Sequence, residues 1–154
     1  MPPFLITDPQ SLNEFVGREF PVTEWFPVSQ ERITLFAKAT EDRQWIHLDR
    51  EKASKESPYG TTIAHGFLTL SLISHFLKSA ILIQSGVRLA VNYGLNRVRF
   101  PAAVRAESRI RARVALLALK KLPDSLEATF NVTIDCEGSE KPACVAEWIV
   151  RYYT

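Results

Sequence analysis

An acid and an imidazole lie five residues apart in the segment TEDRQWIHLD, residues 40–49, as Asp42 and His47. Trp45 and Ile46 stand between them, so both side chains are expected close to apolar surface. Held together in such a place, a carboxylate and an imidazole form a proton-transfer pair, since each can take or return a proton. A helix-ending turn followed by a surface histidine gives the same pattern. The pair by itself leaves both interpretations open.

The spacing of the pair restricts the backbone between its members. On one helix, five residues turn two side chains about 140° apart, so Asp42 and His47 converge only across a loop. The apolar helical periodicity of the preceding segment stops after Ala39. We therefore predict a helix that Ser29 caps and that runs through Lys38, followed by an exit loop over residues 42–47.

A second candidate feature, His65 followed by Gly66, begins the most apolar part of the chain. A glycine at a helix start leaves backbone N–H groups open to a ligand, and the helix dipole there favours negative charge. A tight entry turn without room for a Cβ atom explains the same glycine. Further along, Ser74 places a hydroxyl on the apolar helix. Its partner is either a buried carboxylate or the helix carbonyl four residues back.

The arrangement of apolar residues predicts which elements position these groups. Residues 65–83 are apolar on nearly every side of a helical projection, and such a helix must be surrounded by other structure. Strand patterns follow at residues 87–100, 107–119, 125–137 and 143–153. The simplest packing is an α+β fold in which an antiparallel sheet wraps a long central helix.

Such a sheet has an exposed edge, and two copies that join there form a homodimer. The last strand, VAEWIVRYY, has alternating bulk and no proline, so we predict it as that edge. Asn92, Tyr93 and Gly94 interrupt an earlier strand pattern, which indicates a bulge or the approach of a ligand.

Local signals predict three shorter elements outside the sheet. Residues 11–16 are expected as a short helix with Ser11 at its N-cap, and residues 23–28 as a short extended segment. Asp49 is expected to cap a helix over residues 50–57.

The composition excludes several classes of function. The length of 154 residues predicts one domain, residues 1–154, with residues 1–24 as an N-terminal extension packed on it. The net charge of +2 predicts no attraction to nucleic acid or membrane. The start of the chain lacks a signal pattern and the longest apolar segment contains His75 and Lys78, so we expect a cytoplasmic protein. Cys136 and Cys144 are expected as free thiols. Three scattered histidines do not predict a metal site.

One stretch of the chain is rich in basic residues. Between residues 97 and 121 there is one acid, Glu107, and eight basic residues: Arg97, Arg99, Arg105, Arg109, Arg111, Arg113, Lys120 and Lys121. A solvated strand face explains each of them, and an anionic ligand is the alternative. Phe100 is the only aromatic residue among them, which argues against nucleic acid.

The two motifs together, ATEDRQWIHLD and TIAHGFLTLSLIS, are similar to the MaoC-like dehydratases, which include the (R)-specific enoyl-CoA hydratases of the hot-dog fold. The motif of that family is Asp-x-Asn-Pro-x-His, with a His-Gly at the start of the central helix. The resemblance implies that Asp42 and His47 are the catalytic pair, that Gly66 donates to an oxyanion, and that Ser74 supports the acid. The segments NYGLNRVRFPA and KPACVAEWIVRYY look like the branch named for nodulation protein N.

This chain departs from the family motif at two positions, where Gln44 replaces the asparagine and Trp45 the proline. Gln44 keeps an amide, whereas losing the proline removes a fixed φ, so packing of the Trp45 ring must order the loop. The resemblance also implies supporting or substrate-binding roles for Gln44, His65 and Tyr93.

The implied reaction is hydration of a trans-2-enoyl-CoA to (R)-3-hydroxyacyl-CoA, or its reverse, without a cofactor, because coenzyme A is part of the substrate. Arginines at the tunnel mouth would meet its phosphates. Which of the two catalytic groups is the base stays open. A hot-dog acyl-CoA thioesterase and a non-catalytic acyl-thioester or nodulation-signal binding module are the alternatives. Thioesterases of this fold usually carry a carboxylate on the central helix, and residues 66–83 contain no Asp or Glu.

Overall fold

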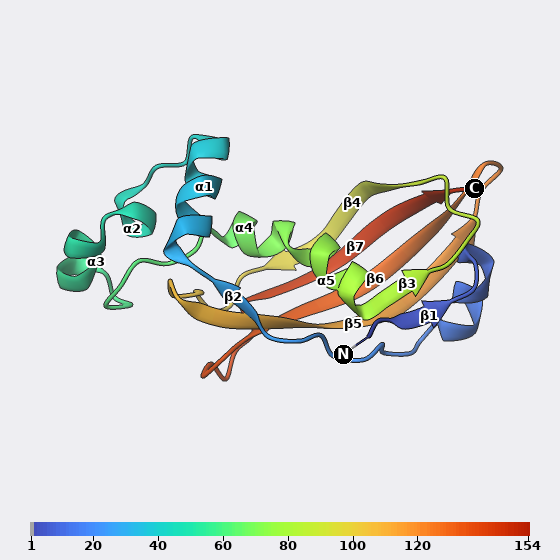
Figure 1. The fold of residues 1–154 in the computed structure, drawn as a ribbon, viewed down its shortest axis with the longest axis horizontal. Coiled ribbons are helices and arrows are strands. Elements are labelled where there is room, and N and C mark those ends of the chain that lie inside the picture. Colours follow the sequence, from blue (N-terminus) through green and yellow to red (C-terminus); the bar gives the residue numbers. More distant parts are fainter. Residues whose placement is uncertain (1) are drawn as a thin grey trace.

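The computed structural model describes residues 2–154, which form an antiparallel sheet and a set of short helices. In chain order the elements are β1 (Phe4–Ile6), the 3₁₀ helix η1 (Pro9–Phe15), β2 (Phe26–Val28), α1 (Gln30–Thr40), α2 (Trp45–Leu48), α3 (Arg50–Glu56), α4 (Gly66–Ser71), α5 (Ile73–Ala80), β3 (Ile81–Ile83), β4 (Leu89–Arg99), β5 (Ser108–Lys121), β6 (Ser125–Cys136) and β7 (Cys144–Tyr153). In Figure 1 the sheet curves beneath α4 and α5, and α1–α3 extend beyond one end of it. The predicted α+β arrangement is confirmed.

The five-stranded sheet has the order β2-β5-β6-β7-β4, and all its neighbours are antiparallel. Its four long strands lie within two residues of their predicted bounds. β6 and β7 alternate between buried and half-buried residues, so one face of each strand supplies the core. Phe130 of β6 and Phe76 of α5 are among the largest fully buried side chains. The central helices therefore cover the apolar face of the sheet.

The prediction that VAEWIVRYY forms the exposed edge is wrong. This segment is β7, and it pairs with β6 on one side and β4 on the other. The edge strands are β4, with 11 residues, and the short β2, with 3. The strand's own pattern carries no information about its neighbours, because the pairing of β7 with β4 joins distant parts of the chain.

The predicted single helix over residues 65–83 is two helices and a strand. Leu72 ends α4 and precedes α5, and its N–H is shared between the carbonyls of Leu68 and Thr69. Residues Ile81–Ile83 leave the helix to form β3, which pairs in parallel with β1 from the start of the chain. Leu, Ile and Ala suit either state in an apolar run, and the distant pairing with β1 selects the strand.

The capping predictions are confirmed at two helices and corrected at a third. Ser29 Oγ accepts the Arg32 N–H at 3.2 Å to begin α1, and Asp49 accepts the Lys52 N–H at 2.9 Å to begin α3. At η1 the cap is Asp8 rather than Ser11, because Asp8 accepts the Ser11 N–H at 2.9 Å and Pro9 occupies the first helical position. Ser11 lies inside the helix, and its hydroxyl donates to the same carboxylate.

Two further expectations are met in the described residues. The register of β4 against β7 shifts between Asn92 and Gly94, so the predicted bulge is present. Cys136 and Cys144 are free and buried. Among residues 2–154, no helix has the length and apolar character that crossing a membrane requires.

Candidate functional site

The end of α1 sets the position of Asp42. Glu41 closes the helix in the left-handed conformation, with φ 61°, and this turns the chain sharply away from the helix axis. Asp42 follows at the start of the loop and is exposed to solvent. Its backbone carbonyl accepts a hydrogen bond of 2.9 Å from His65 Nε2. A histidine 23 residues away in the chain thus fixes the turn that carries the acid.

His47 lies on the single-turn helix α2 and not in the predicted exit loop, which is limited to residues 41–44. Its side chain is buried, and Nδ1 lies 2.7 Å from the carbonyl oxygen of Ile63. A carbonyl only accepts, so Nδ1 carries the proton and the neutral ring keeps a lone pair on Nε2. Burial lowers the pKa of His47 and His65 lowers it further, against the bond to Ile63 and the charge of Asp42. The buried ring therefore favours its neutral form.

Asp42, His47 and His65 converge. One carboxylate oxygen and one nitrogen of each ring lie within 4.8 Å of one another. The two imidazole rings stack, with centroids 3.7 Å apart and planes inclined by 22°. A single water with hydrogen bonds of about 2.8 Å spans a gap of this size between the carboxylate and an imidazole. The predicted convergence of the pair is present, with a second histidine beside it.

A carboxylate and two imidazoles at this distance raise the question of a metal ion. An imidazole binds a metal in the plane of its ring, at about 2.0–2.1 Å for zinc. The rings of His47 and His65 are stacked, with centroids 3.7 Å apart and planes inclined by only 22°. An ion at bonding distance from a nitrogen of each ring would therefore not lie in the plane of both rings. The donor set does not fit a shared ion, and we derive no chemistry from one.

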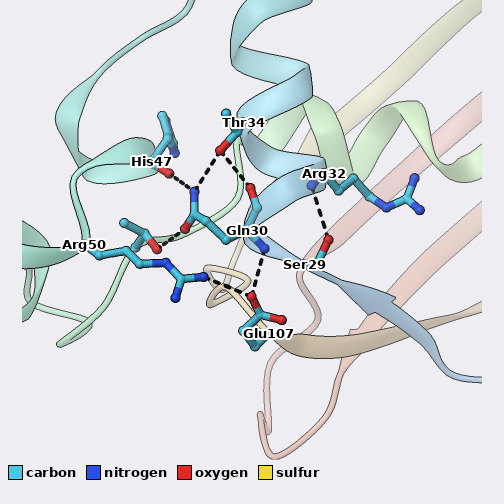
Figure 2. A network of polar contacts seen from close by, with 8 residues as sticks. Ser29, Gln30, Arg32, Thr34, His47, Arg50 and Glu107 are labelled. Carbon is cyan, nitrogen blue, oxygen red and sulfur yellow. Dashed lines mark hydrogen bonds and ion pairs between the residues drawn. The ribbon is translucent and has the colours of Figure 1, made fainter.

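Gln30 is not among the residues predicted from the sequence, but its hydrogen bonds connect the segments that carry the site (Figure 2). Its side-chain amide donates to the His47 carbonyl at 2.8 Å and accepts from the Thr62 hydroxyl at 2.5 Å. Its backbone N–H donates to Glu107, which also accepts from Arg50. Gln30 thus ties α1 to α2 and to the segment before His65. A glutamine that follows an N-cap is ordinary in sequence, so only the fold reveals this role.

Gly66 is the first residue of α4, so its N–H has no acceptor within the helix. It directly follows His65, which places the helix start beside the convergent groups. A Cβ atom at this position would lie 3.1–3.2 Å from ring carbons of Phe100. The predicted tight entry is therefore real, and the close neighbour is an aromatic ring.

The remaining predicted residues occupy different places: Ser74 lies on α5, Tyr93 on β4, and Gln44 between Asp42 and His47. Ser74 Oγ donates to the carbonyl of Ser71, three residues back, at 3.4 Å, and not to a carboxylate. Ser74 and Tyr93 both line a cavity of about 330 Å³ between the central helices and β4. The guanidinium of Arg151 lies 3.4 Å from the centroid of the Tyr93 ring. Gln44 is exposed at the N-cap of α2 and makes no capping hydrogen bond with its side chain.

Several of the basic residues are paired with acids on the neighbouring strand. Arg113 binds Asp135 through two hydrogen bonds of 3.0 Å, and Arg109 binds both carboxylate oxygens of Glu137. Both guanidinium groups are near half exposed, as in a solvated strand face. Arg105 instead lines a cavity of about 510 Å³ together with Lys141.

Residues 12–135 match the family model of the MaoC like domain. The chain belongs to the MaoC-like dehydratase family. It is 50% identical over 137 residues to "3-hydroxyacyl-thioester dehydratase Z" of Mycobacterium tuberculosis (strain ATCC 25618 / H37Rv), covering 88% of this chain and 89% of that protein. It is 44% identical over 135 residues to "Nodulation protein N" of Rhizobium leguminosarum bv. viciae, covering 87% and 84%.

The solved structure of the "(R)-hydratase from A. caviae involved in PHA biosynthesis" superposes on this MaoC-like chain with a TM-score of 0.65 at 25% identity, covering 84% of this chain and 95% of that one. The predicted hot-dog fold is therefore confirmed, with α4 and α5 as the central helix and the sheet wrapped around it. Family and fold together make this protein an enzyme of the hydro-lyase class.

Proposed function

We propose that this protein adds water to a trans-2-enoyl thioester of coenzyme A to give the (R)-3-hydroxyacyl thioester, or catalyses the reverse dehydration. The observation that carries the proposal is the approach of the Asp42 carboxylate and the His47 ring within 4.8 Å, beside the start of α4. The name of the mycobacterial relative, a 3-hydroxyacyl-thioester dehydratase, supports the substrate class. The reaction needs no cofactor, since coenzyme A is part of the substrate.

In this mechanism Asp42 and His47 hold one water between them. The Nδ1 proton of His47 is bound to the Ile63 carbonyl, so Nε2 is the nitrogen that accepts from the water. Water oxygen bonds to C3 of the enoyl group while one of its protons passes to the pair. The pair returns a proton to C2, which leaves its protonation state unchanged overall. Because the two groups share one water, neither alone is assigned as the base.

Attack at C3 moves negative charge onto the thioester oxygen, because the double bond is conjugated with that carbonyl. The free N–H of Gly66 at the start of α4 is placed to donate to this oxygen. Removing one such donor typically costs about 3 kcal/mol of barrier. A glycine is also required here for steric reasons, since a Cβ atom would lie 3.1–3.2 Å from ring carbons of Phe100.

We further propose that the enzyme works as a homodimer joined along β4. This edge strand exposes a row of apolar side chains, Leu89, Val91, Tyr93 and Leu95. Phe67 of α4, next to Gly66, is 67% exposed. A second copy placed on this edge would cover the strand and the cavity lined by Ser74 and Tyr93.

The test is to incubate the protein with crotonyl-CoA and with longer trans-2-enoyl-CoAs while following the absorbance of the enoyl thioester. Separate (R)- and (S)-specific 3-hydroxyacyl-CoA dehydrogenases identify the product, and a thiol reagent detects free coenzyme A. We expect oxidation by the (R)-specific enzyme alone. Oxidation by the (S)-specific enzyme alone contradicts the proposal, thiol release without hydration favours a thioesterase, and no product at any chain length favours a binding module.

A further inference from the structure

His65 contacts both members of the proposed catalytic pair. Its Nε2–H donates to the backbone carbonyl of Asp42 at 2.9 Å, and its ring stacks on that of His47 at 3.7 Å. A third ring, that of Phe36 from α1, has its centroid 5.0 Å from the centroid of the His65 ring. One side chain thus bridges the loop that carries Asp42 and the helix that carries His47.

The His65 ring is fixed by its surroundings. Only 3% of the residue is exposed, and its backbone is held at the N-cap of α4. The carbonyl of Asp42 requires a proton on Nε2, which sets the tautomer. A movement of this ring would displace the Asp42 turn and the His47 ring together.

Packing alone does not account for a histidine at this position. Its Nδ1 is buried and has no hydrogen-bond partner in the part of the chain that the structure describes. A buried polar atom without a partner costs free energy, and a phenylalanine would fill the space without that cost. The hydrogen bond to Asp42 is the contact that a phenylalanine cannot make.

We propose that His65 is a positioning residue, which sets the separation of Asp42 and His47 by holding the Asp42 carbonyl on its Nε2–H and the His47 ring on its face. The proposal rests on the proposed hydratase function. It assigns His65 no contact with the substrate, which agrees with its burial. A misplacement of about 1 Å in such a site can cost about 100-fold in rate.

Two substitutions separate the two contacts. His65→Phe keeps a ring against His47 and removes the donor, whereas His65→Gln keeps an N–H near the position of Nε2 and removes the ring. His75 supplies matched controls, because it is an exposed histidine of α5 whose ring lies 4.8 Å from that of Phe26. His75→Phe and His75→Gln are expected to leave turnover within about twofold of the parent enzyme.

The kinetic test uses the purified full chain with crotonyl-CoA. We expect kcat of His65→Phe to fall by about 10- to 100-fold while KM stays within about threefold, since only the placement of the reacting groups changes. His65→Gln is expected to recover part of that loss. A thermal melt checks that both variants fold. Folded His65→Phe with kcat within about twofold of wild type overturns the proposal, and so does a rise in KM at unchanged kcat.

Nuclear magnetic resonance tests the geometry without turnover. In the wild-type protein the ¹⁵N shifts of the His65 ring should report a protonated Nε2, and a bare Nε2 overturns the proposal even if both variants fail to fold. In His65→Phe the carbonyl ¹³C resonance of Asp42 should move as it loses its hydrogen bond, and in His65→Gln the His47 ring protons should lose the shift caused by stacking. A wild-type protein that hydrates no enoyl thioester refutes the proposed function, while these resonances still decide the role of His65.

Discussion

At the scale of single residues, the two ring nitrogens of His47 have different surroundings. Nδ1–H is committed to the Ile63 carbonyl, which orients the ring and leaves Nε2 for a water. Asp42 provides the complementary group from an exposed turn, so water and substrate can reach the pair. Both side chains can be replaced by amides of similar shape, which makes the pair testable without disturbing the fold.

Asp42→Asn and His47→Gln are each expected to lower kcat for hydration by about 10²- to 10⁴-fold, because each removes a group that exchanges a proton with the water. Steady-state kinetics on crotonyl-CoA, together with circular dichroism, measure activity and fold. His75→Gln is the control and should match wild type. Folded variants that keep near wild-type turnover on every enoyl-CoA would remove the pair from the mechanism.

The pH dependence follows from the lowered pKa of His47. The neutral ring, whose Nε2 accepts a hydrogen bond from the water, should persist below the usual histidine pKa of about 6.5, so kcat/KM for hydration should fall only at pH values below about 6.5. For stability the sign is the same: the unfolded ring binds a proton first, so stability is full above about pH 6.5 and decreases as pH falls from there toward the folded-state pKa. A pH–rate profile measures the first effect, and an acidic limb centred above 6.5 contradicts it. Urea unfolding of wild type and His47→Gln across this range measures the second.

At the scale of elements, the site depends on how α1, α2 and the segment before α4 are joined. Gln30 makes this connection at the first residue of α1, and Thr62, whose hydroxyl it accepts from, is fully buried. Ile63 follows Thr62 and carries the carbonyl that orients His47. The position of the imidazole is therefore set by hydrogen bonds that reach it from two other elements.

Gln30→Ala should destabilise the protein by about 1–3 kcal/mol, because it leaves the Thr62 hydroxyl and the His47 carbonyl without their partner. For a chain of this size that corresponds to a fall in Tm of about 2–12 °C. Hydratase activity should fall as well, since α2 loses its anchor. Gln84→Ala, which shortens an exposed side chain, is the control. A Tm equal to that of the control would show that the network contributes nothing to stability.

At the scale of the whole molecule, the sheet leaves one long edge unpaired. Among residues 2–154, β4 pairs with β7 alone, and its Val91 and Leu95 are each more than 40% exposed. A long edge strand with exposed apolar residues favours pairing with another chain. The adjoining Phe67 and the cavity beside Ser74 extend the same surface toward the helix start.

Val91→Lys is expected to convert the proposed homodimer to a monomer, because the charge would be buried in the interface. Light scattering should give twice 17.5 kDa, about 35 kDa, for wild type and 17.5 kDa for the variant. Leu117→Lys is the matched control, since Leu117 is similarly exposed but lies on β5, away from the β4 edge. A wild-type mass of 17.5 kDa at micromolar concentration would refute the homodimer.

Local patterns in the sequence were sufficient for the parts of the molecule that depend on neighbouring residues. The N-caps Ser29 and Asp49, the four long strands and the bulge beside Tyr93 follow from capping chemistry and from period-two alternation, which act over a few residues. The types and spacing of Asp42 and His47, with Gly66 ahead of an apolar run, identified the candidate site for the same reason.

Only the tertiary structure decided which distant segments meet. It placed β4 rather than β7 at the edge, turned Ile81–Ile83 into a strand against β1, and brought Gln30 and His65 to the proposed catalytic pair. It also directed the Ser74 hydroxyl to a helix carbonyl instead of to Asp42. These contacts join residues far apart in the chain, and their energy depends on closure of the whole sheet around the helices. The apolar periodicity of a single segment therefore does not predict these contacts.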